Sequence, residues 1–250
     1  MSSSKLLLSS LGALLLLGLL GVLRWRAATP PAPAAAPAYI SYRADLRRTP
    51  LRLYWRDGQQ RRYGSLGHLR DALAAQGQQL VFAMNAGMFR PDFSPQGLFI
   101  ENGILQSPLD TARGAGNFYL LPNGVFFTTA DNRAHIVETA HFRAGREVCY
   151  ATQSGPLLLI DGRIHLAFRP GSANRQIRNG VGVLPTGEVL LAMSSAPVSL
   201  YDFAAYFRRA GCRQALYLDG FVSRTYAPAQ HWTQLDGDFG VIIGITAPRR

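Results

Sequence analysis

The sequence predicts an α+β fold: a hairpin-rich mixed sheet with a few helices, in a single globular domain behind an N-terminal hydrophobic segment. Short apolar runs recur along the chain and are separated by turn dipeptides such as Asn-Gly and Asp-Gly. Only two segments have clear helical spacing. The chain has 250 residues, 48% of them apolar and 16% charged, so it can bury one sizeable core and is not largely disordered.

The N-terminal segment is interpreted as a targeting element. Leu6 to Leu23 is an apolar run whose length lies between that of a signal-peptide core and that of a membrane span. No small-x-small cleavage site directly follows it, which favours an inner-membrane signal anchor over a removed signal peptide in residues 1–26. Residues 27–38 form a Pro/Ala linker, and residues 39–250 the domain. We therefore expect a domain in the periplasm or at the cell exterior, with secretion after signal cleavage as the alternative.

The first part of the domain predicts two strands and a helix. Residues 51–55 form a strand, followed by a turn at Asp57-Gly58. Residues 66–76 have helical spacing and stop at Gly77. Residues 79–84 form a short apolar strand.

The middle of the domain predicts hairpins, since paired apolar runs flank Gly-containing turns. The four expected hairpins join 98–100 with 104–105, 118–121 with 125–128, 157–160 with 163–166, and 180–184 with 189–193. Residues 199–210 then form a helix, because Leu200, Phe203 and Phe207 share one face. The strands 215–218 and 241–245 complete the domain.

The composition and the motifs that are absent exclude several classes of function. No Rossmann fingerprint, P-loop, GxSxG elbow or HExxH occurs. The net charge is +11 and nearly all basic residues are arginines. The arginines are scattered and do not interleave with aromatic residues, so we expect no nucleic-acid partner. A GC-rich genome, which favours arginine over lysine, is the simpler explanation for the many arginines. Binding of an anionic substrate such as a phosphodiester is the more specific one.

The residues that bind metals or form disulfides are few. Each of the five histidines stands alone, without ligand spacing, so we expect no metal site and no cofactor. Cys149 and Cys212 are the only cysteines. In an exported domain we expect them to form one disulfide, whereas in the cytosol two buried thiols are the alternative.

Polar residues beside glycines, directly after apolar runs, form four corners. The corners contain Asn85, Gly87 and Asp92; Gln153 and Gly155; Arg175, Arg178 and Asn179; and Asp219 and Ser223. Taken singly, each corner is more simply an ordinary turn. Together they supply the amides, arginines and carboxylates that phosphate and sugar hydroxyls require, so we expect them to line one pocket.

Motifs in these corners resemble those of the phosphodiester glycosidase family. They are, in order, MNAGMF at 84–89, P-x-G-L at 95–98 leading into ENG, TQSGPLLL at 152–159, RNGVG at 178–182 and YLDG at 217–220. The resemblance runs from about Asn85 to the C-terminus and is closer to the small bacterial exported branch than to the lysosomal uncovering enzyme. Phe221 and Val222 stand where the family pattern has glycines.

The resemblance implies an exported or membrane-tethered hydrolase that cleaves a sugar-1-phosphodiester in an envelope or exported glycan. Glycosidases usually use two carboxylates, but phosphate leaves readily as an anion, so cationic donors matter more than an acid. A non-catalytic module that binds such a glycan is the alternative.

The expected roles follow from that chemistry. Asp219 faces the anomeric carbon or its water, and Asp92 is the second choice, ahead of Glu101 and Asp110. Arg178, with Arg175 or Arg113, holds the phosphate bidentately. The remaining substrate-binding residues are Asn85, Gly87, Gln153, Gly155, Asn179 and Ser223.

Overall fold

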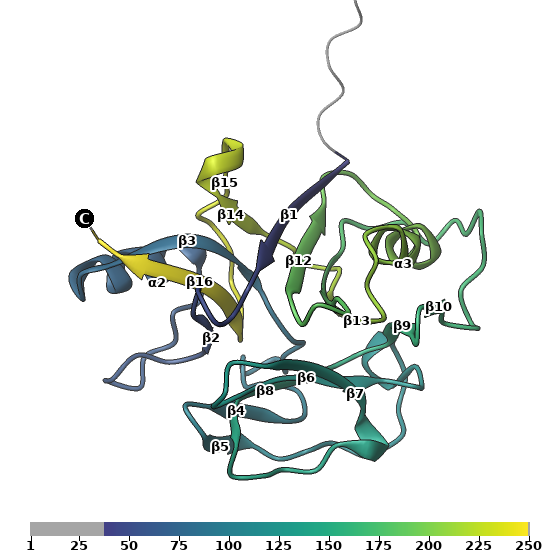
Figure 1. The fold of residues 1–250 in the computed structure, drawn as a ribbon, viewed down its shortest axis with the longest axis horizontal. Helices are drawn as coiled ribbons and strands as arrows, with labels where there is room; N and C mark the ends of the chain where they lie inside the picture. Colours follow the sequence, from purple (N-terminus) through teal and green to yellow (C-terminus); the bar gives the residue numbers. More distant parts are fainter. Residues whose placement is uncertain (1–37, 250) are drawn as a thin grey trace, which may run out of the picture. The chain divides into compact units, whose positions relative to one another are not determined.

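A computed structural model describes residues 38–249 as three antiparallel β-sheets and two α-helices (Figure 1). These residues belong to one compact unit. The expected targeting segment and nearly all of the linker lie outside the described residues. Within 38–249, neither helix is long and apolar enough to cross a membrane. The α+β class is thus correct, but the strands form three sheets rather than one mixed sheet.

The first sheet contains two of the expected hairpins. Its order is β1 (Tyr39–Ala44), β12 (Val189–Ser194), β11 (Asn179–Val183), β13 (Gln214–Asp219), β9 (Leu157–Ile160) and β10 (Arg163–Ile164). The hairpins β9–β10 and β11–β12 are confirmed. Strand β1 was not predicted, although buried Ile40 and Ala44 lie on alternate positions of it.

The second sheet brings the C-terminal strand beside strands from the first part of the domain. Its order is β15 (Trp232–Thr233), β14 (Thr225–Ala227), β3 (Gln78–Asn85), β16 (Ile242–Pro248) and β2 (Leu51–Tyr54). The C-terminal strand β16 pairs with β2 on one side and β3 on the other. The predicted strands at 51–55, 79–84 and 241–245 correspond to β2, β3 and β16 and are therefore confirmed.

The third sheet corrects one predicted hairpin. Its order is β5 (Ile104–Ser107), β4 (Phe99–Glu101), β8 (Val148–Ser154), β6 (Gly124–Thr129) and β7 (Ala134–Glu138). The expected pairing of 118–121 with 125–128 is wrong, because β6 pairs with β7 and β8 instead. Residues Asn117–Tyr119 form the 3₁₀ helix η1, and the Asn123 side chain donates a 2.8 Å hydrogen bond to the Phe118 carbonyl. That local bond and Pro122, which has no N–H, both oppose strand pairing there.

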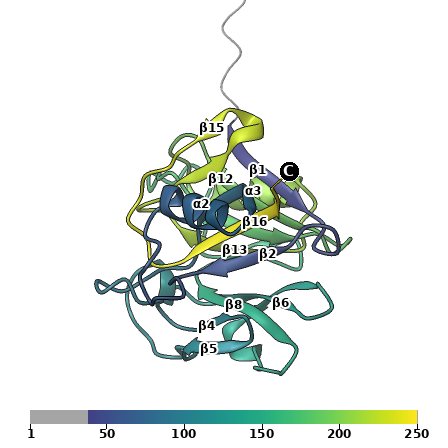
Figure 2. The same cartoon turned by 90° about the vertical axis from the view of Figure 1, so that its left-hand side faces the viewer.

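The two helices cover outer faces of the first and second sheets. Helix α2 (Leu66–Ala75) begins at Ser65, whose side chain accepts a bond from the His68 N–H, and packs on the second sheet (Figure 2). Helix α3 (Leu200–Arg209) begins at Ser199, which caps the Asp202 N–H, and packs on the first sheet. Capping by serine is typical of helix N-termini. Two further 3₁₀ helices, η2 and η3, span Thr139–His141 and Pro228–Gln230.

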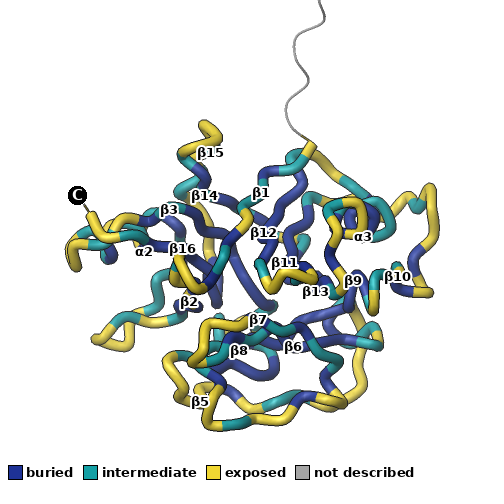
Figure 3. The backbone as a smooth tube through the Cα atoms, in the orientation of Figure 1, coloured by how far each residue is buried: buried dark blue, intermediate teal, exposed yellow. Residues whose placement is uncertain are grey.

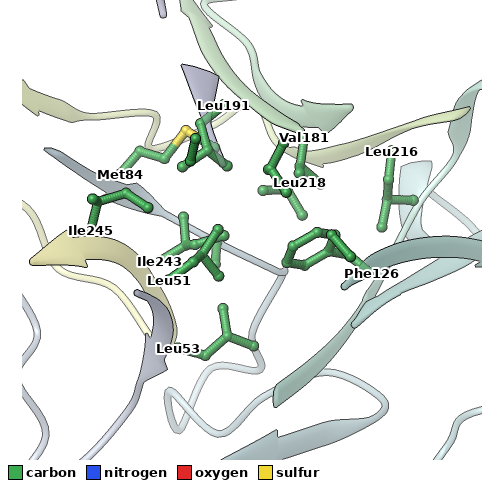
Figure 4. Close-up of a cluster of buried hydrophobic side chains, with 14 of the residues drawn as sticks. Leu51, Leu53, Met84, Phe126, Val181, Leu191, Leu216, Leu218, Ile243 and Ile245 are labelled. Carbon is green, nitrogen blue, oxygen red and sulfur yellow. The ribbon is translucent and has the colours of Figure 1, made fainter. Parts of the chain in front are cut away.

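All three sheets contribute to a central core. Strand β13 shows how: Leu216 and Leu218 point into this core, whereas Ala215 and Tyr217 pack beneath α3. Figure 4 shows these leucines with apolar side chains from the other sheets, and Figure 3 shows the buried strands inside exposed loops. Burial on both faces explains why such strands read as continuous apolar runs. It also fixes the polar residues that end these strands.

Candidate active site

The candidate site lies where the ends of three strands meet. Strand β13 ends at Asp219, directly opposite Asn179 at the start of β11. Strand β3 of the second sheet ends at Asn85. The chain crosses from the first sheet to the second through residues 220–224, which lie between β13 and β14. Rigid strands from two sheets therefore set the positions of these side chains.

The Asp219 carboxylate is buried and held by donors on both oxygens. Its Oδ1 accepts hydrogen bonds from the N–H groups of Gly220 at 2.6 Å and Phe221 at 2.9 Å. Its Oδ2 accepts a 3.0 Å bond from Nδ2 of Asn85. Only 7% of the residue is exposed. The carboxylate therefore has a fixed orientation, and Oδ2 keeps acceptor capacity beyond its one bond.

A chain of side-chain amides orients Asn85 toward this carboxylate. Asn179 Nδ2 donates to the Asn85 backbone carbonyl at 2.7 Å and to Asn85 Oδ1 at 2.8 Å. The Arg224 N–H also donates to Asn85 Oδ1, at 2.9 Å. With its oxygen so engaged, Asn85 must present its NH₂ group to Asp219. In the described residues, Asn179 Oδ1 is a buried acceptor without a hydrogen-bond partner.

Burial raises the pKa of Asp219 above its ordinary value. Desolvation of the charged form is the largest effect, and it outweighs the opposing hydrogen bonds from the Phe221 and Gly220 N–H groups and from Asn85. A carboxyl group with a raised pKa is a better proton acceptor when ionised than an exposed one. The site therefore holds a directed carboxylate of increased basicity.

Arg178 is a fully buried cation whose contacts are all neutral. It is 1% exposed. Its Nε donates to the Val198 carbonyl, its Nη2 to both oxygens of Asn174, and its Nη1 to the Tyr217 hydroxyl at 3.0 Å. A buried charge is costly unless it is paired. The pairing group is absent from these contacts, so the guanidinium is suited to an anion that enters the site.

The expected bidentate grip by Arg178 is wrong in its geometry. The four contacts above engage four of the five guanidinium N–H groups. One N–H of Nη1 is left for a ligand. Arg178 can therefore supply positive charge and one hydrogen bond, but it cannot offer a free fork to two phosphate oxygens.

Tyr217 and Gly220 connect the cation to the carboxylate. The Tyr217 ring is buried, and burial raises the pKa of its hydroxyl to about 12, against the opposing effect of Arg178. A Cβ atom on Gly220 would overlap this hydroxyl and lie 3.4 Å from Arg178 Nη1. Glycine at this position thus lets the backbone beside Asp219 approach the Arg178–Tyr217 pair.

Asp219, Arg178, Tyr217 and Gly220 line a cavity of about 330 Å³, a size at the small end for ligand sites. Asn85 and Asn179, which were expected to bind substrate, support Asp219 from behind and are not among the lining residues. Its wall contains one carboxylate, one guanidinium, three side-chain amides and a phenol. The lining residues are Met88, Asn117, Asn174, Gln176, Arg178, Tyr217, Asp219, Gly220 and Phe221. A larger groove of about 560 Å³ lies between α2 and the C-terminal strand, but it contains none of this cluster.

Gln153 does not join the cavity, contrary to expectation. Its Oε1 accepts bonds from the N–H groups of Leu98 at 3.0 Å and Asp110 at 2.9 Å, and its Nε2 donates to the Asp110 carbonyl at 2.6 Å and to the Thr139 hydroxyl at 3.4 Å. The side chain is fully buried. Gln153 is therefore a clamp on two backbone segments, and its amide has no group left for a substrate.

The exposed charged residues of the predicted set also lie outside the cavity lining. Asp92 accepts bonds from the N–H and hydroxyl of Ser94, which lower the pKa of its carboxyl and close a local turn. Arg175 points to the Pro197 carbonyl. Arg113 is exposed in the loop after β5. Asp92, the second choice for the catalytic carboxylate, therefore does not line the pocket that contains Asp219.

The predicted glycines and Ser223 have packing roles. A Cβ on Gly87 would overlap Thr152, and one on Gly155 would lie 2.6 Å from the Asn123 Cβ. Ser223 donates to the carbonyls of Asp219 and Ile177 at 3.2 and 3.3 Å. Ser223 therefore ties down the loop after Asp219 without lining the cavity.

Two less favoured carboxylates have other environments. Burial raises the pKa of Glu101 to about 7, but this residue ends β4 in the third sheet. Asp110 accepts a bond from the Tyr119 hydroxyl at 2.9 Å and one from the Ala112 N–H at 2.8 Å. Neither lines the cavity.

The expected disulfide is not formed. Cys149 and Cys212 are both free thiols. Cys149 lies on β8 in the third sheet, whereas Cys212 is buried beneath α3, where Phe207 and Ala215 share its cluster. Burial raises the pKa of the Cys212 thiol to about 11, so it is an inert core residue.

Sequence reasoning missed several residues of the site. Tyr217 lies inside the YLDG motif, from which the sequence analysis predicts only Asp219 as a site residue. Asn117 begins the short 3₁₀ helix η1 and Asn174 lies in a loop, and neither position has a local sequence signal. Ser154, the neighbour of Gln153, donates to the Leu218 carbonyl at 2.9 Å and so supports the strand that carries Asp219.

The chain belongs to the phosphodiester glycosidase family, whose model matches residues 78–241. The chain is also 37% identical over 177 residues to the uncharacterized Escherichia coli protein YigE, covering 70% of this chain and 69% of YigE. The family resemblance drawn from the motifs is therefore confirmed.

Solved structures show the same fold at low identity. The catalytic domain of zebrafish N-acetylglucosamine-1-phosphodiester alpha-N-acetylglucosaminidase, auto-inhibited by its pro-peptide, matches with a TM-score of 0.58, 13% identity and 85% coverage of both chains. A hypothetical protein from Synechocystis matches with a TM-score of 0.54 and 16% identity, over 84% of this chain and 59% of its own. A candidate exported protein from Burkholderia pseudomallei matches with a TM-score of 0.56 and 13% identity, over 83% of this chain and 73% of its own.

Proposed function

We propose that this protein is a glycosidase-type hydrolase that cleaves the bond between a sugar and phosphate in a sugar-1-phosphodiester. The observation that carries the proposal is the pairing, in one cavity, of the directed Asp219 carboxylate with the buried and unpaired charge of Arg178. The carboxylate serves the sugar carbon and the cation serves the phosphate. Membership of the phosphodiester glycosidase family supports this assignment.

Asp219 acts at the anomeric carbon. As a base, its Oδ2 takes a proton from water while the water oxygen bonds to that carbon and the carbon–oxygen bond to phosphate breaks. As a nucleophile, the same oxygen bonds to the carbon while the carbon–oxygen bond to phosphate breaks; in a second step the oxygen of a water molecule bonds to that carbon, the bond to Asp219 breaks, and the released carboxylate takes the water proton. Asn85 holds the carboxylate in position in both cases.

Arg178 stabilises the leaving group. The departing phosphate monoester carries the electrons of the broken bond as an anion, so it needs little help from a general acid. This fits a cavity in which, of the described residues, Asp219 is the only carboxylate. The spare N–H of Nη1 and the unpaired positive charge stabilise the charge that develops in the transition state.

We further propose that the domain acts outside the cytoplasm, on an envelope or exported glycan. The apolar run Leu6–Leu23 and the Pro/Ala segment behind it support a tethered domain. The fold shared with a candidate exported protein is consistent with this location. Membrane association through that run, or secretion after cleavage, follows from the same proposal.

The single carboxylate also favours a second candidate, a module that binds such glycans without cleaving them. Most glycosidases place two carboxylates about the scissile bond. A binding module would use the same cation and amides to hold the ligand. It would release no sugar.

A screen for turnover tests both candidates. The purified full chain is incubated with a panel of sugar-1-phosphodiesters that differ in sugar and in the group beyond the phosphate, and free sugar is followed by NMR. We expect release of sugar and of a phosphate monoester from at least one compound, and the anomer formed first identifies base or nucleophile. Saturable binding of a panel member without release of sugar would instead establish the binding module.

A further inference from the structure

Phe221 is the most exposed large apolar side chain of the described residues. It is 96% exposed and lies in the wall of the cavity that contains Asp219. Single exposed apolar residues are common on protein surfaces and need no explanation. Phe221 differs from them because its backbone N–H is bonded to the carboxylate of Asp219, which places its side chain beside the cavity.

The loop after Asp219 is built to turn Phe221 outward. The Phe221 N–H donates to Asp219 Oδ1 at 2.9 Å. The next residue, Val222, packs in the cluster beneath α2. Ser223 then donates to the Asp219 carbonyl at 3.2 Å. These contacts hold the backbone on both sides of this position, and the ring projects into water at the cavity mouth.

The chemistry of the cavity indicates what the ring contacts. The lining adds Met88 to Phe221 on the apolar side, and the amides of Asn117, Asn174 and Gln176 on the polar side. A pyranose ring has the matching character, since its C–H groups form apolar faces and its hydroxyls project from the edge. A fully polar anion such as free phosphate would not use an aromatic group.

We propose that Phe221 is a specificity-determining platform on which the apolar face of a pyranose ring stacks, so that the Asp219 carboxylate meets the anomeric edge. This inference rests on the proposed function of the cavity and names the part of the substrate that enters it. The backbone N–H of Phe221 keeps its bond to Asp219 whatever the side chain. The ring therefore contributes to binding rather than to the chemical step.

The test measures binding and turnover separately. Saturation-transfer NMR on the full chain uses a panel of methyl hexopyranosides as probes, with sorbitol as a hydroxyl-rich control that has no ring face. The variants are Phe221→Ala, Phe221→Trp and, as a matched control, Leu166→Ala, since Leu166 is 89% exposed but outside the cavity lining. The Michaelis constant and kcat are measured on any phosphodiester that the turnover screen finds.

We expect transfer from aromatic protons to the ring C–H groups of at least one pyranoside and none to sorbitol. Phe221→Ala should weaken binding about tenfold, a typical worth for an aromatic contact, and raise KM by a similar factor with kcat nearly unchanged. Phe221→Trp should restore binding, and Leu166→Ala should change nothing.

Two outcomes would overturn the platform: no panel member binds the wild-type chain, or Phe221→Ala binds as the wild type does. The second outcome with turnover intact leaves the hydrolase proposal standing. Ring-dependent binding without any turnover has the opposite meaning, because the platform is then supported and the hydrolase is not.

Discussion

Asp219 and Gln153 occupy similar places in the chain but have different roles. Each ends or nearly ends a buried strand, lies within two residues of a glycine and is almost inaccessible to water. Both polar atoms of the Gln153 amide form hydrogen bonds with the backbone of Leu98 and Asp110. Asp219 is held by two N–H groups and Asn85, yet lines a cavity that also contains Arg178.

The comparison shows that burial and glycine neighbours do not distinguish a site from a structural clamp. The distinction lies in whether hydrogen-bonding capacity and charge are left over. Gln153 is neutral and satisfied. Asp219 and Arg178 are charged, separately held by neutral groups, and able to act on a ligand between them.

Replacing Asp219 should have the largest effect on activity. Asp219→Asn removes the negative charge and is nearly isosteric, so we expect kcat/KM on the phosphodiester found by the screen to fall by roughly 10³-fold or more. The new amide faces the NH₂ of Asn85, where wild type has a 3.0 Å hydrogen bond. This donor–donor contact should cost about 1 kcal/mol in the free energy of unfolding.

Exchanging the carboxylate and the amide between positions 219 and 85 separates the effect on stability from the effect on activity. In the double variant Asp219→Asn with Asn85→Asp, the new carboxylate accepts from the amide at 219 and still accepts from the Arg224 and Asn179 N–H groups that Asn85 Oδ1 engages. We expect stability by chemical denaturation to recover while activity stays lost. Asp92→Asn, at an exposed turn carboxylate, serves as the control with wild-type activity. Full activity in Asp219→Asn would remove Asp219 from the mechanism.

The sequence predicts those parts of the fold whose signals are local. The hairpins β4–β5 and β11–β12 have turn residues between apolar runs, and helix α3 has a serine cap and one apolar face. The partner of β6 could not be predicted, because the Asn123 side chain and Pro122 replace strand pairing with a local turn. The division into three sheets depends on long-range pairing such as β16 with β2.

The sequence predicts those site residues whose charged or amide side chain lies at, or directly next to, one end of a strand. Asn85, Arg178, Asn179 and Asp219 come together for that reason. The hydrogen-bond partners of each group were not predictable. Gln153 and Arg178 donate most of their N–H groups to oxygens of other segments, and no sequence pattern announces those contacts. Asn117 lies in the single-turn helix η1 and Asn174 in a loop, and in such short or irregular segments no periodicity marks a residue that faces a ligand.

Replacing Gln153 should have the reverse effect of replacing Asp219. Gln153→Glu is also nearly isosteric, but it places a carboxylate oxygen where Nε2 donates to the Asp110 carbonyl at 2.6 Å. A buried charge against an acceptor should lower the free energy of unfolding by about 2–4 kcal/mol. Activity per folded molecule should stay within about twofold of wild type.

Chemical denaturation and active-site-normalised kinetics measure the two effects of Gln153→Glu. Gln59→Ala, at an exposed glutamine whose side chain forms no hydrogen bond within residues 38–249, is the control and should be neutral. A Gln153→Glu protein that is stable but inactive would place Gln153 in the site after all and remove the contrast with Asp219.

The smallest expected effect is the pH dependence of the difference between wild type and Asp219→Asn. Burial raises the folded-state pKa of Asp219 above the ordinary 3.8. The folded state therefore holds this proton at pH values where the unfolded chain has lost it, and the wild type loses stability relative to the variant as pH rises from 3.8 through the raised pKa. The same pKa places the acid limb of kcat/KM above 3.8, because a protonated Asp219 can neither accept a proton nor attack carbon.

Denaturation of both proteins across this range, alongside the pH profile of kcat/KM, measures the two consequences. A stability difference that is flat with pH would mean that solvent, or the hydrogen bonds from the Gly220 and Phe221 N–H groups and from Asn85, offset the cost of burying this carboxylate. Asp219 would then resemble Gln153 as a satisfied structural group.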